Sequence, residues 1–155
     1  MFRVHPLRYY QRLISLCLSC AVIAATPISV SAHQGASGIV KERMDQFSQA
    51  RGQMKQINGA LRASDLLGVA EITSQMMAWA DEMADAFPDG SDYAPSQASP
   101  AIWQDKTGFA AAIARYDGAI DDLYKAARAN DSNAALEGFQ ALGASCKSCH
   151  RAYRK

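Results

Sequence analysis

The apolar positions of this chain of 155 residues recur at helical spacing over most of its length. The first predicted helix covers residues 37–63, where apolar side chains recur in alternating steps of three and four. This spacing brings one residue per turn onto a single seam, as in an antiparallel helical bundle. The seam residues are Val40, Arg43, Phe47, Ala50, Met54, Ile57 and Leu61.

Three further helices are predicted from the same kind of pattern. The second begins after an N-cap at Ser64, the third covers about residues 102–129, and the fourth begins at a cap formed by Asp131 or Ser132. Residues 87–100 contain three of the five prolines and are predicted to form a loop. The other links are short, which favours an all-α, antiparallel up-down four-helix bundle. One side of the fourth helix consists of Leu136, Phe139, Leu142, Cys146, Cys149 and Tyr153.

The beginning of the chain has a different character. Residues 1–12 contain three arginines and no acidic residue, residues 13–25 carry no charge, and Ala32 ends a stretch of small residues. These features are typical of a cleaved export signal, and the apolar run is shorter than the roughly 20 residues of a membrane-spanning helix. We therefore predict a signal peptide over residues 1–32 and a single domain over residues 33–155.

Two alternatives concern this same segment. It could stay attached as a membrane anchor, or Cys20 could receive a lipid, although the residues before Cys20 fit a lipidation motif poorly. Cys17 and Cys20 form a Cys-x-x-Cys pair that signal cleavage would remove.

The charge of the predicted mature chain limits its partners. Cleavage would remove three of the 16 basic residues and none of the 15 acidic ones, which leaves a formal charge of −2. A nearly neutral chain lacks the basic surface that nucleic acids require. No second long apolar run is found, so no membrane span is predicted after cleavage.

The sequence CKSCH at residues 146–150 has the spacing of a covalent haem attachment site. On a helix, Cys146 and His150 share a face and Cys149 lies beside them. The two thiols could then form thioethers with the haem, and the imidazole of His150 could bind the iron as an axial ligand. A zinc site needs about four ligands, and a disulfide across this helical spacing would be strained.

Arg43 is an unusual residue for the seam of the first helix. A buried guanidinium requires an anionic partner, and the two propionates of a haem could supply it. Alternatively, the start of the helix is frayed and Arg43 reaches solvent.

Four segments resemble the class II c-type cytochromes, the cytochrome c-prime family. They are GIVKERMDQF at residues 38–47, FPDGS at 87–91, AIWQDKTGF at 101–109 and CKSCHRAYR at 146–154. The resemblance extends over essentially all of the predicted mature chain. Part of the first segment, KERMDQ, is similar to the branch of the family in which a methionine completes a low-spin iron site.

The resemblance implies one covalently bound haem c per chain and a periplasmic location in a bacterium. It implies that Arg43 lies near a haem propionate and that Arg154 lies near the haem edge. It also implies that homodimers could form through the first two helices.

The family divides over the sixth iron ligand, which is a methionine in one branch and is replaced by an apolar side chain in the other. The corresponding position, four residues after Arg43, is Phe47 in this chain. Phenylalanine cannot bind iron, so this position favours five-coordinate iron. Met54 and Met44 remain possible sixth ligands, although methionines at helical spacing are usually core residues.

The resemblance implies one-electron transfer with periplasmic redox partners as the function. The alternative, which Phe47 favours, is a haem protein that binds NO or CO. An enzyme is not predicted, because no distal His–Arg pair for oxygen–oxygen cleavage is evident near Phe47.

Overall fold

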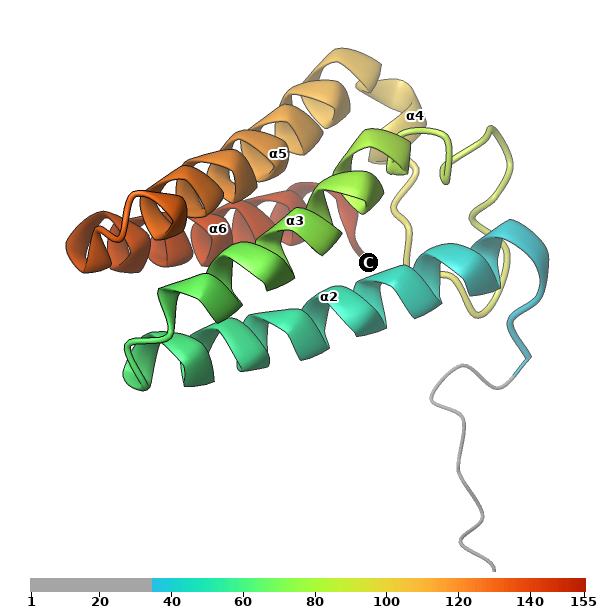
Figure 1. Ribbon diagram of the computed structural model, residues 1–155. Coiled ribbons are helices and arrows are strands. Elements are labelled where there is room, and N and C mark those ends of the chain that lie inside the picture. The colour runs from blue at the N-terminus through green and yellow to red at the C-terminus, as the bar shows by residue number, and fades with distance from the viewer. Residues whose placement is uncertain (1–34) are drawn as a thin grey trace, which may run out of the picture. The chain divides into compact units, whose positions relative to one another are not determined.

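Five helices make up most of residues 35–155, the part of the chain that this computed structural model describes (Figure 1). They are α2 (Gly38–Arg62), α3 (Leu66–Glu82), α4 (Ala101–Gln104), α5 (Lys106–Arg128) and α6 (Ser132–Tyr153). No strand occurs within these residues. None of the five helices is long and apolar enough to cross a membrane. The predicted export signal lies outside the described residues.

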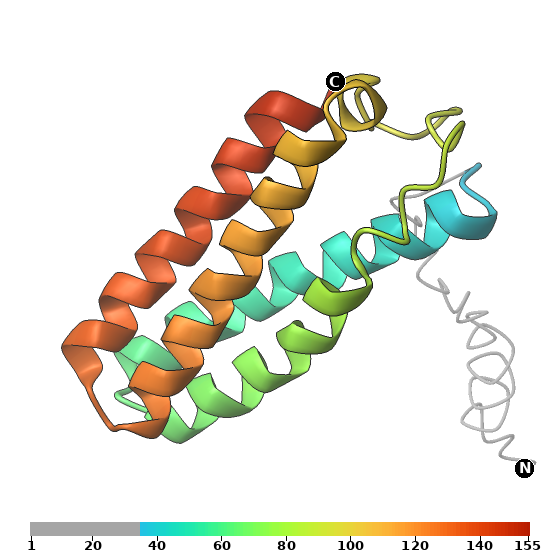
Figure 2. The ribbon, with the colours of Figure 1, turned by 90° about the horizontal axis from the view of Figure 1, so that it is seen from above.

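The four long helices form two antiparallel pairs, α2 with α3 and α5 with α6 (Figures 1 and 2). Within each pair the connection is only a few residues long, which forces the two helices to lie side by side. The pairs then pack together through contacts of α3 with α5 and of α2 with α6. This arrangement confirms the predicted all-α, antiparallel four-helix bundle.

Aspartate side chains cap the long helices that follow a turn. Asp65 begins α3, where its Oδ1 atom accepts a hydrogen bond from the backbone N–H of Gly68 at 2.8 Å. Asp131 caps α6 in the same manner, as one of the two predicted alternatives. The prediction that Ser64 caps the second helix is wrong, because Ser64 has a φ angle of 58° and belongs to the turn. Removing such a cap typically costs about 1 kcal/mol.

The predicted third helix is interrupted at Asp105. This residue ends α4, and its Oδ1 atom accepts a hydrogen bond from the N–H of Gly108 at 2.9 Å to begin α5. The hydroxyl of Tyr153 donates to the other carboxylate oxygen of Asp105 at 3.1 Å. A continuous helix over residues 102–129 is therefore wrong in its first turn, because the carboxylate of Asp105 bonds to the backbone and starts a new helix.

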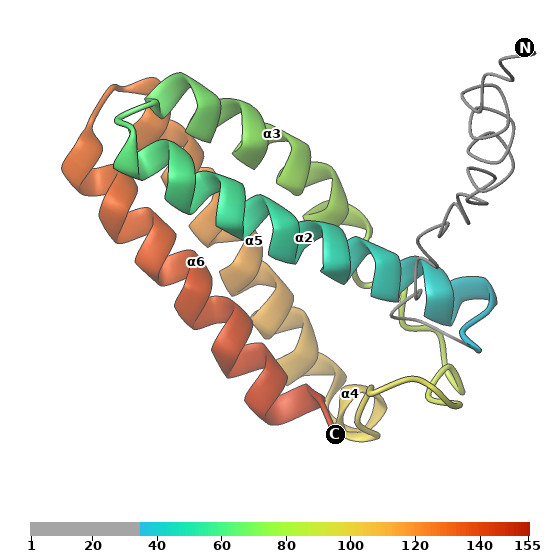
Figure 3. The same cartoon turned by 90° about the horizontal axis from the view of Figure 1, so that it is seen from below.

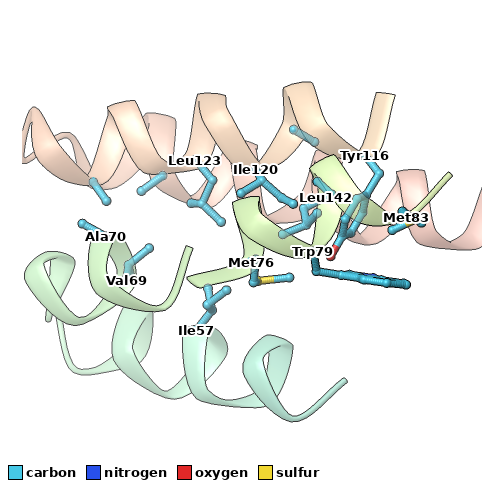
Figure 4. Close-up of a cluster of buried hydrophobic side chains, with 14 of the residues drawn as sticks. Ile57, Val69, Ala70, Met76, Trp79, Met83, Tyr116, Ile120, Leu123 and Leu142 are labelled. Atoms are coloured by element: carbon cyan, nitrogen blue, oxygen red, sulfur yellow. The ribbon is translucent and has the colours of Figure 1, made fainter. Parts of the chain in front are cut away.

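Apolar side chains from all four long helices meet in the core (Figure 4). The largest of those that are fully buried are Ile57, Val69, Met76, Ile120, Leu123 and Leu142. At Gly138, α6 approaches α5 so closely that an added Cβ would lie 3.0 Å from the Cα atom of Leu123. Leu136, which we predicted on the inner side of the fourth helix, is instead 49% exposed. Its neighbours Ala135 and Gly138 are buried there, because only small residues fit this close contact.

The two helix pairs diverge toward the end of the bundle that carries α4 (Figures 2 and 3). The loop between α3 and α4 lies at this end, close to the C-terminus. The N–H of Ser99 donates to the carbonyl of Tyr153 at 2.9 Å, and the N–H of Lys155 donates to the carbonyl of Gln97 at 2.8 Å. These two bonds join the C-terminal end of the chain to the loop, at the end of the bundle where the helix pairs diverge.

Candidate haem-binding site

A cavity of about 710 Å³ lies between the diverging helices. Its volume is in the range of about 300–1,000 Å³ that is usual for cofactor sites. Every site residue that we predicted from the sequence lines it: Arg43, Met44, Phe47, Met54, Cys146, Cys149, His150 and Arg154. The fold therefore brings together residues that are more than 100 positions apart in the sequence.

The helix α6 supplies Cys146, Cys149 and His150 to one wall of this cavity. Both cysteines are free thiols and partly buried. Burial raises the pKa of each thiol, so both are protonated near neutral pH. One turn of helix separates Cys146 from His150, which places the two on the same face.

The side chain of His150 lines the cavity. Its pKa is lowered by burial first, and then by the positive charges of Arg154 and Arg51. Each of these effects favours the neutral imidazole, which is the form that binds a metal.

Phe47 on α2 faces His150 from the opposite side of the cavity. The ring centroids lie 6.3 Å apart and the ring planes meet at 71°. Two other rings flank Phe47: Trp79 makes an edge contact at 5.5 Å, and Phe87 lies 6.3 Å away. The side chain across from the predicted axial histidine is therefore an aromatic ring that its neighbours hold in place.

The two candidate methionines lie elsewhere along α2. Met54 is close to Gly143, where an added Cβ would lie 3.9 Å from the methionine Cε atom. Met44 lies at the other end of the cavity lining, one turn before Phe47. Met76 of α3 and Met83, which directly follows α3, also line the cavity, and our sequence analysis did not include them in the site. Both are buried core residues, so the apolar pattern alone could not separate them from the rest of the core.

Arg43 is buried, with only 3% of its surface exposed. The alternative in which it reaches solvent is therefore wrong. Its guanidinium donates to the carbonyls of Ala86 and Ser91 and to the hydroxyls of Ser91 and Ser96. Burial lowers its pKa, an effect that the nearby Tyr93 and Asp92 oppose. Within residues 35–155, no carboxylate makes a hydrogen bond or ion pair with this guanidinium.

The chemistry of the cavity wall fits a haem. Among its lining residues in the described part of the chain are three arginines and no aspartate or glutamate, which suits a group that carries two carboxylates. Most of the other lining residues are apolar and suit a flat macrocycle. The hydroxyl of Tyr116 is buried in this wall without a hydrogen-bond partner from the described residues. Burial and the neighbouring Cys146 raise the pKa of this hydroxyl, so it remains a neutral donor.

Arg51 is a site residue that our sequence analysis missed. It lies one turn after Phe47 on α2 and lines the cavity. The spacing of four residues from Phe47 could have indicated that Arg51 lies near the site. Arg51 was missed because it lies one position after Ala50 and therefore off the predicted seam. A basic residue is therefore present beside Phe47, although none of the described residues adds a second histidine to this wall.

A helical bundle with a CKSCH sequence on a cavity wall defines the class of mono-haem c-type cytochromes. The family model described as Cytochrome C' matches residues 38–154. The chain belongs to the cytochrome c′ family, which confirms the resemblance noted in the sequence. Haem c, attached covalently, is the cofactor of this family and of this chain.

Named relatives extend over most of the chain. It is 29% identical over 143 residues to the cytochrome c′ of Rhodospirillum rubrum, which covers 90% of this chain and 97% of the relative. It is 33% identical over 113 residues to the cytochrome c-556 of Agrobacterium tumefaciens, which covers 66% of this chain and 91% of the relative.

Solved structures share the fold. The cytochrome c′ of Rubrivivax gelatinosus matches with a TM-score of 0.68 and 23% identity, over 76% of this chain and 94% of that chain. A nitric oxide complex of a mutant cytochrome c prime from Alcaligenes xylosoxidans matches with a TM-score of 0.69 and 26% identity, over 76% and 93% of the two chains.

Proposed function

We propose that Cys146 and Cys149 attach the haem and that His150 binds its iron. Each thiol would add across one vinyl group, with the sulfur bonding one vinyl carbon and the hydrogen the other. The two cysteines and the histidine lie within five residues of one helix and line the same cavity, which supports this assignment. Residues 1–32 would direct export to the periplasm, and residues 33–155 would form the mature haem-binding domain.

The iron would be five-coordinate and would bind small uncharged gases such as NO and CO. The observation that carries this conclusion is the position of Phe47, whose ring centroid is 6.3 Å from that of His150. A phenyl ring offers no ligand atom, so Phe47 would leave the sixth position of the iron without a ligand from its own side chain. The nitric oxide complex of a mutant cytochrome c prime from Alcaligenes xylosoxidans supports gas binding by this chain as well.

Optical spectra of the purified holoprotein test this function. We expect high-spin spectra in both the ferric and the ferrous states, and a ferrous spectrum that changes when CO is added. A low-spin ferric spectrum with a methionine–iron charge-transfer band, together with no response to CO, would exclude five-coordinate iron.

One-electron transfer to periplasmic redox partners is a second candidate function. The observation that favours it is the cavity wall, where His150 is the one histidine and no aspartate or glutamate is found among the described lining residues. The iron would then cycle between its ferric and ferrous states, and the protein would set the midpoint potential through the axial ligand, the apolar wall and nearby charges.

Arg51 provides a test of that electrostatic control. A cation beside the iron favours the ferrous state, so the Arg51→Gln variant should have a lower midpoint potential. We expect a decrease of roughly 20–60 mV, since about 59 mV corresponds to a tenfold change for a one-electron couple. Potentiometric titration of the holoprotein measures this midpoint potential.

The control variant, Arg128→Gln, removes an exposed charge from α5 that does not line the cavity. This control should leave the potential unchanged, and equal potentials for all three proteins would contradict a role for Arg51.

A further inference from the structure

A single side chain of α2, Arg43, fastens the loop that follows α3. Its Nη1 atom donates to the carbonyl oxygen of Ala86 at 3.1 Å and to the hydroxyl of Ser91 at 2.7 Å. Its Nη2 atom donates to the hydroxyl of Ser96 at 2.6 Å and to the carbonyl of Ser91. We refer to residues 86–96 as the latched loop. All four acceptors belong to it, and two of its serines, Ser91 and Ser96, are almost fully buried.

The same guanidinium lies over the ring of Phe87 in the latched loop. The Arg43 Cζ atom is 4.6 Å from the centroid of this ring, within the distance of a cation–π interaction. The Phe87 ring contacts Phe109 of α5 at 5.1 Å and lies 6.3 Å from Phe47. Arg43 therefore contacts both the backbone of the loop and Phe87, the loop residue whose ring lies beside the ring facing His150.

Phe47 is restrained from two sides. Trp79 contacts it edge-on at 5.5 Å, and Phe87 lies on another side. Trp79 is buried within α3, a regular helix, whereas Phe87 belongs to a loop. Of these two neighbours of Phe47, only Phe87 has a position that depends on the latched loop.

We propose that Arg43 is a positioning residue, which controls ligand access to the iron by holding the latched loop and keeping Phe87 against Phe47. The proposal rests on the proposed five-coordinate iron. It differs from the role that the family resemblance implies, in which Arg43 acts through a haem propionate. Four hydrogen bonds join its guanidinium to the carbonyls and hydroxyls of the loop, and these bonds carry the proposal.

The two roles can be separated without changing Arg43 itself. The double variant Ser91→Ala/Ser96→Ala removes two of the four acceptors and leaves the charge that would attract a propionate. Phe87→Leu removes the ring between the loop and Phe47 but leaves all four hydrogen bonds. Ser99→Ala is the matched control, because the hydroxyl of Ser99 bonds to the N–H of Ala101 and not to Arg43.

Two measurements on the holoprotein test whether Arg43 holds the latched loop and whether the loop controls access to the iron. The first is the rate constant for CO binding to the ferrous protein, and the second is amide hydrogen exchange over residues 87–93. In the double serine variant we expect CO binding to be about tenfold faster, together with faster exchange, as for a loop that gates a site. Phe87→Leu should bind CO faster without the faster exchange. Ser99→Ala should match the wild type in both.

Two results of these measurements would overturn the proposal. If exchange in the double variant stays at the wild-type rate, Arg43 does not hold the loop and the proposal fails. If exchange is faster and CO binding is unchanged, the loop does not control access and the proposal also fails. Arg43→Lys, which keeps the charge but not the four bonds, should behave like the double variant. Failure of the proposed function would instead appear in the wild type, as a low-spin spectrum without CO binding, and the exchange measurement would still report on the loop.

Discussion

When Cys146 and Cys149 are both replaced by serine, we expect the chain to lose covalent haem completely. A hydroxyl does not add to a vinyl group under these conditions, so no thioether can form. Haem staining after denaturing electrophoresis and the pyridine haemochrome spectrum measure the attached haem. Each single variant should keep one thioether, and its haemochrome band should shift toward that of haem with one unreacted vinyl group.

The chain contains its own control for this experiment. Cys17 and Cys20 have the same spacing but lie in the predicted export signal. Replacing both of them by serine should leave covalent haem at the wild-type level. Retention of covalent haem in the Cys146→Ser/Cys149→Ser protein would show that another residue carries the attachment.

The second large effect is expected at Phe47. Replacing it with methionine would put a thioether sulfur opposite His150, where a phenyl ring now lies. Methionine with histidine is an axial pair that stabilises low-spin iron and raises its potential. We therefore expect Phe47→Met to change the ferric spectrum from high-spin to low-spin, to raise the midpoint potential, and to slow CO binding at least tenfold.

Two further variants examine the natural methionines. Met54→Leu and Met44→Leu remove a thioether from the cavity wall at nearly constant volume. Both should keep the wild-type spectrum if Phe47 alone faces the sixth position. A wild type that is already low-spin, and becomes high-spin in either of these variants, would identify the ligand as that methionine.

The helices could be predicted because their patterns are local in the sequence. The seam of the first helix follows from steps of three and four, and three of the four buried residues of α2, Val40, Arg43 and Ile57, lie on it, whereas the fourth, Gln53, does not. The predicted attachment sequence, CKSCH, is local as well, because its two cysteines and its histidine lie within five residues. Signals of this kind do not depend on how distant segments pack.

The features that sequence reasoning missed depend on such packing. The prediction left open whether Arg43 meets a carboxylate or solvent, whereas it bonds to carbonyls and hydroxyls of a loop more than 40 residues away. The break at Asp105 results from a carboxylate that competes for the backbone, and Tyr153 supports it from the other end of the chain. Periodicity describes which face of a helix is buried, but it contains no information about the partners of a buried polar group.

The cavity residues of α2 occupy successive turns of one helix, from Arg43 through Phe47 and Arg51 to Met54. The proposed attachment residues all belong to α6, on the other side of the cavity. We therefore expect substitutions along this stripe of α2 to change ligand access, spin state and potential, while the machinery that recognises the attachment sequence still meets the same residues. Such a division allows descendants of one gene to acquire different iron chemistry through a few point mutations, without a new scaffold and without a new route of cofactor insertion.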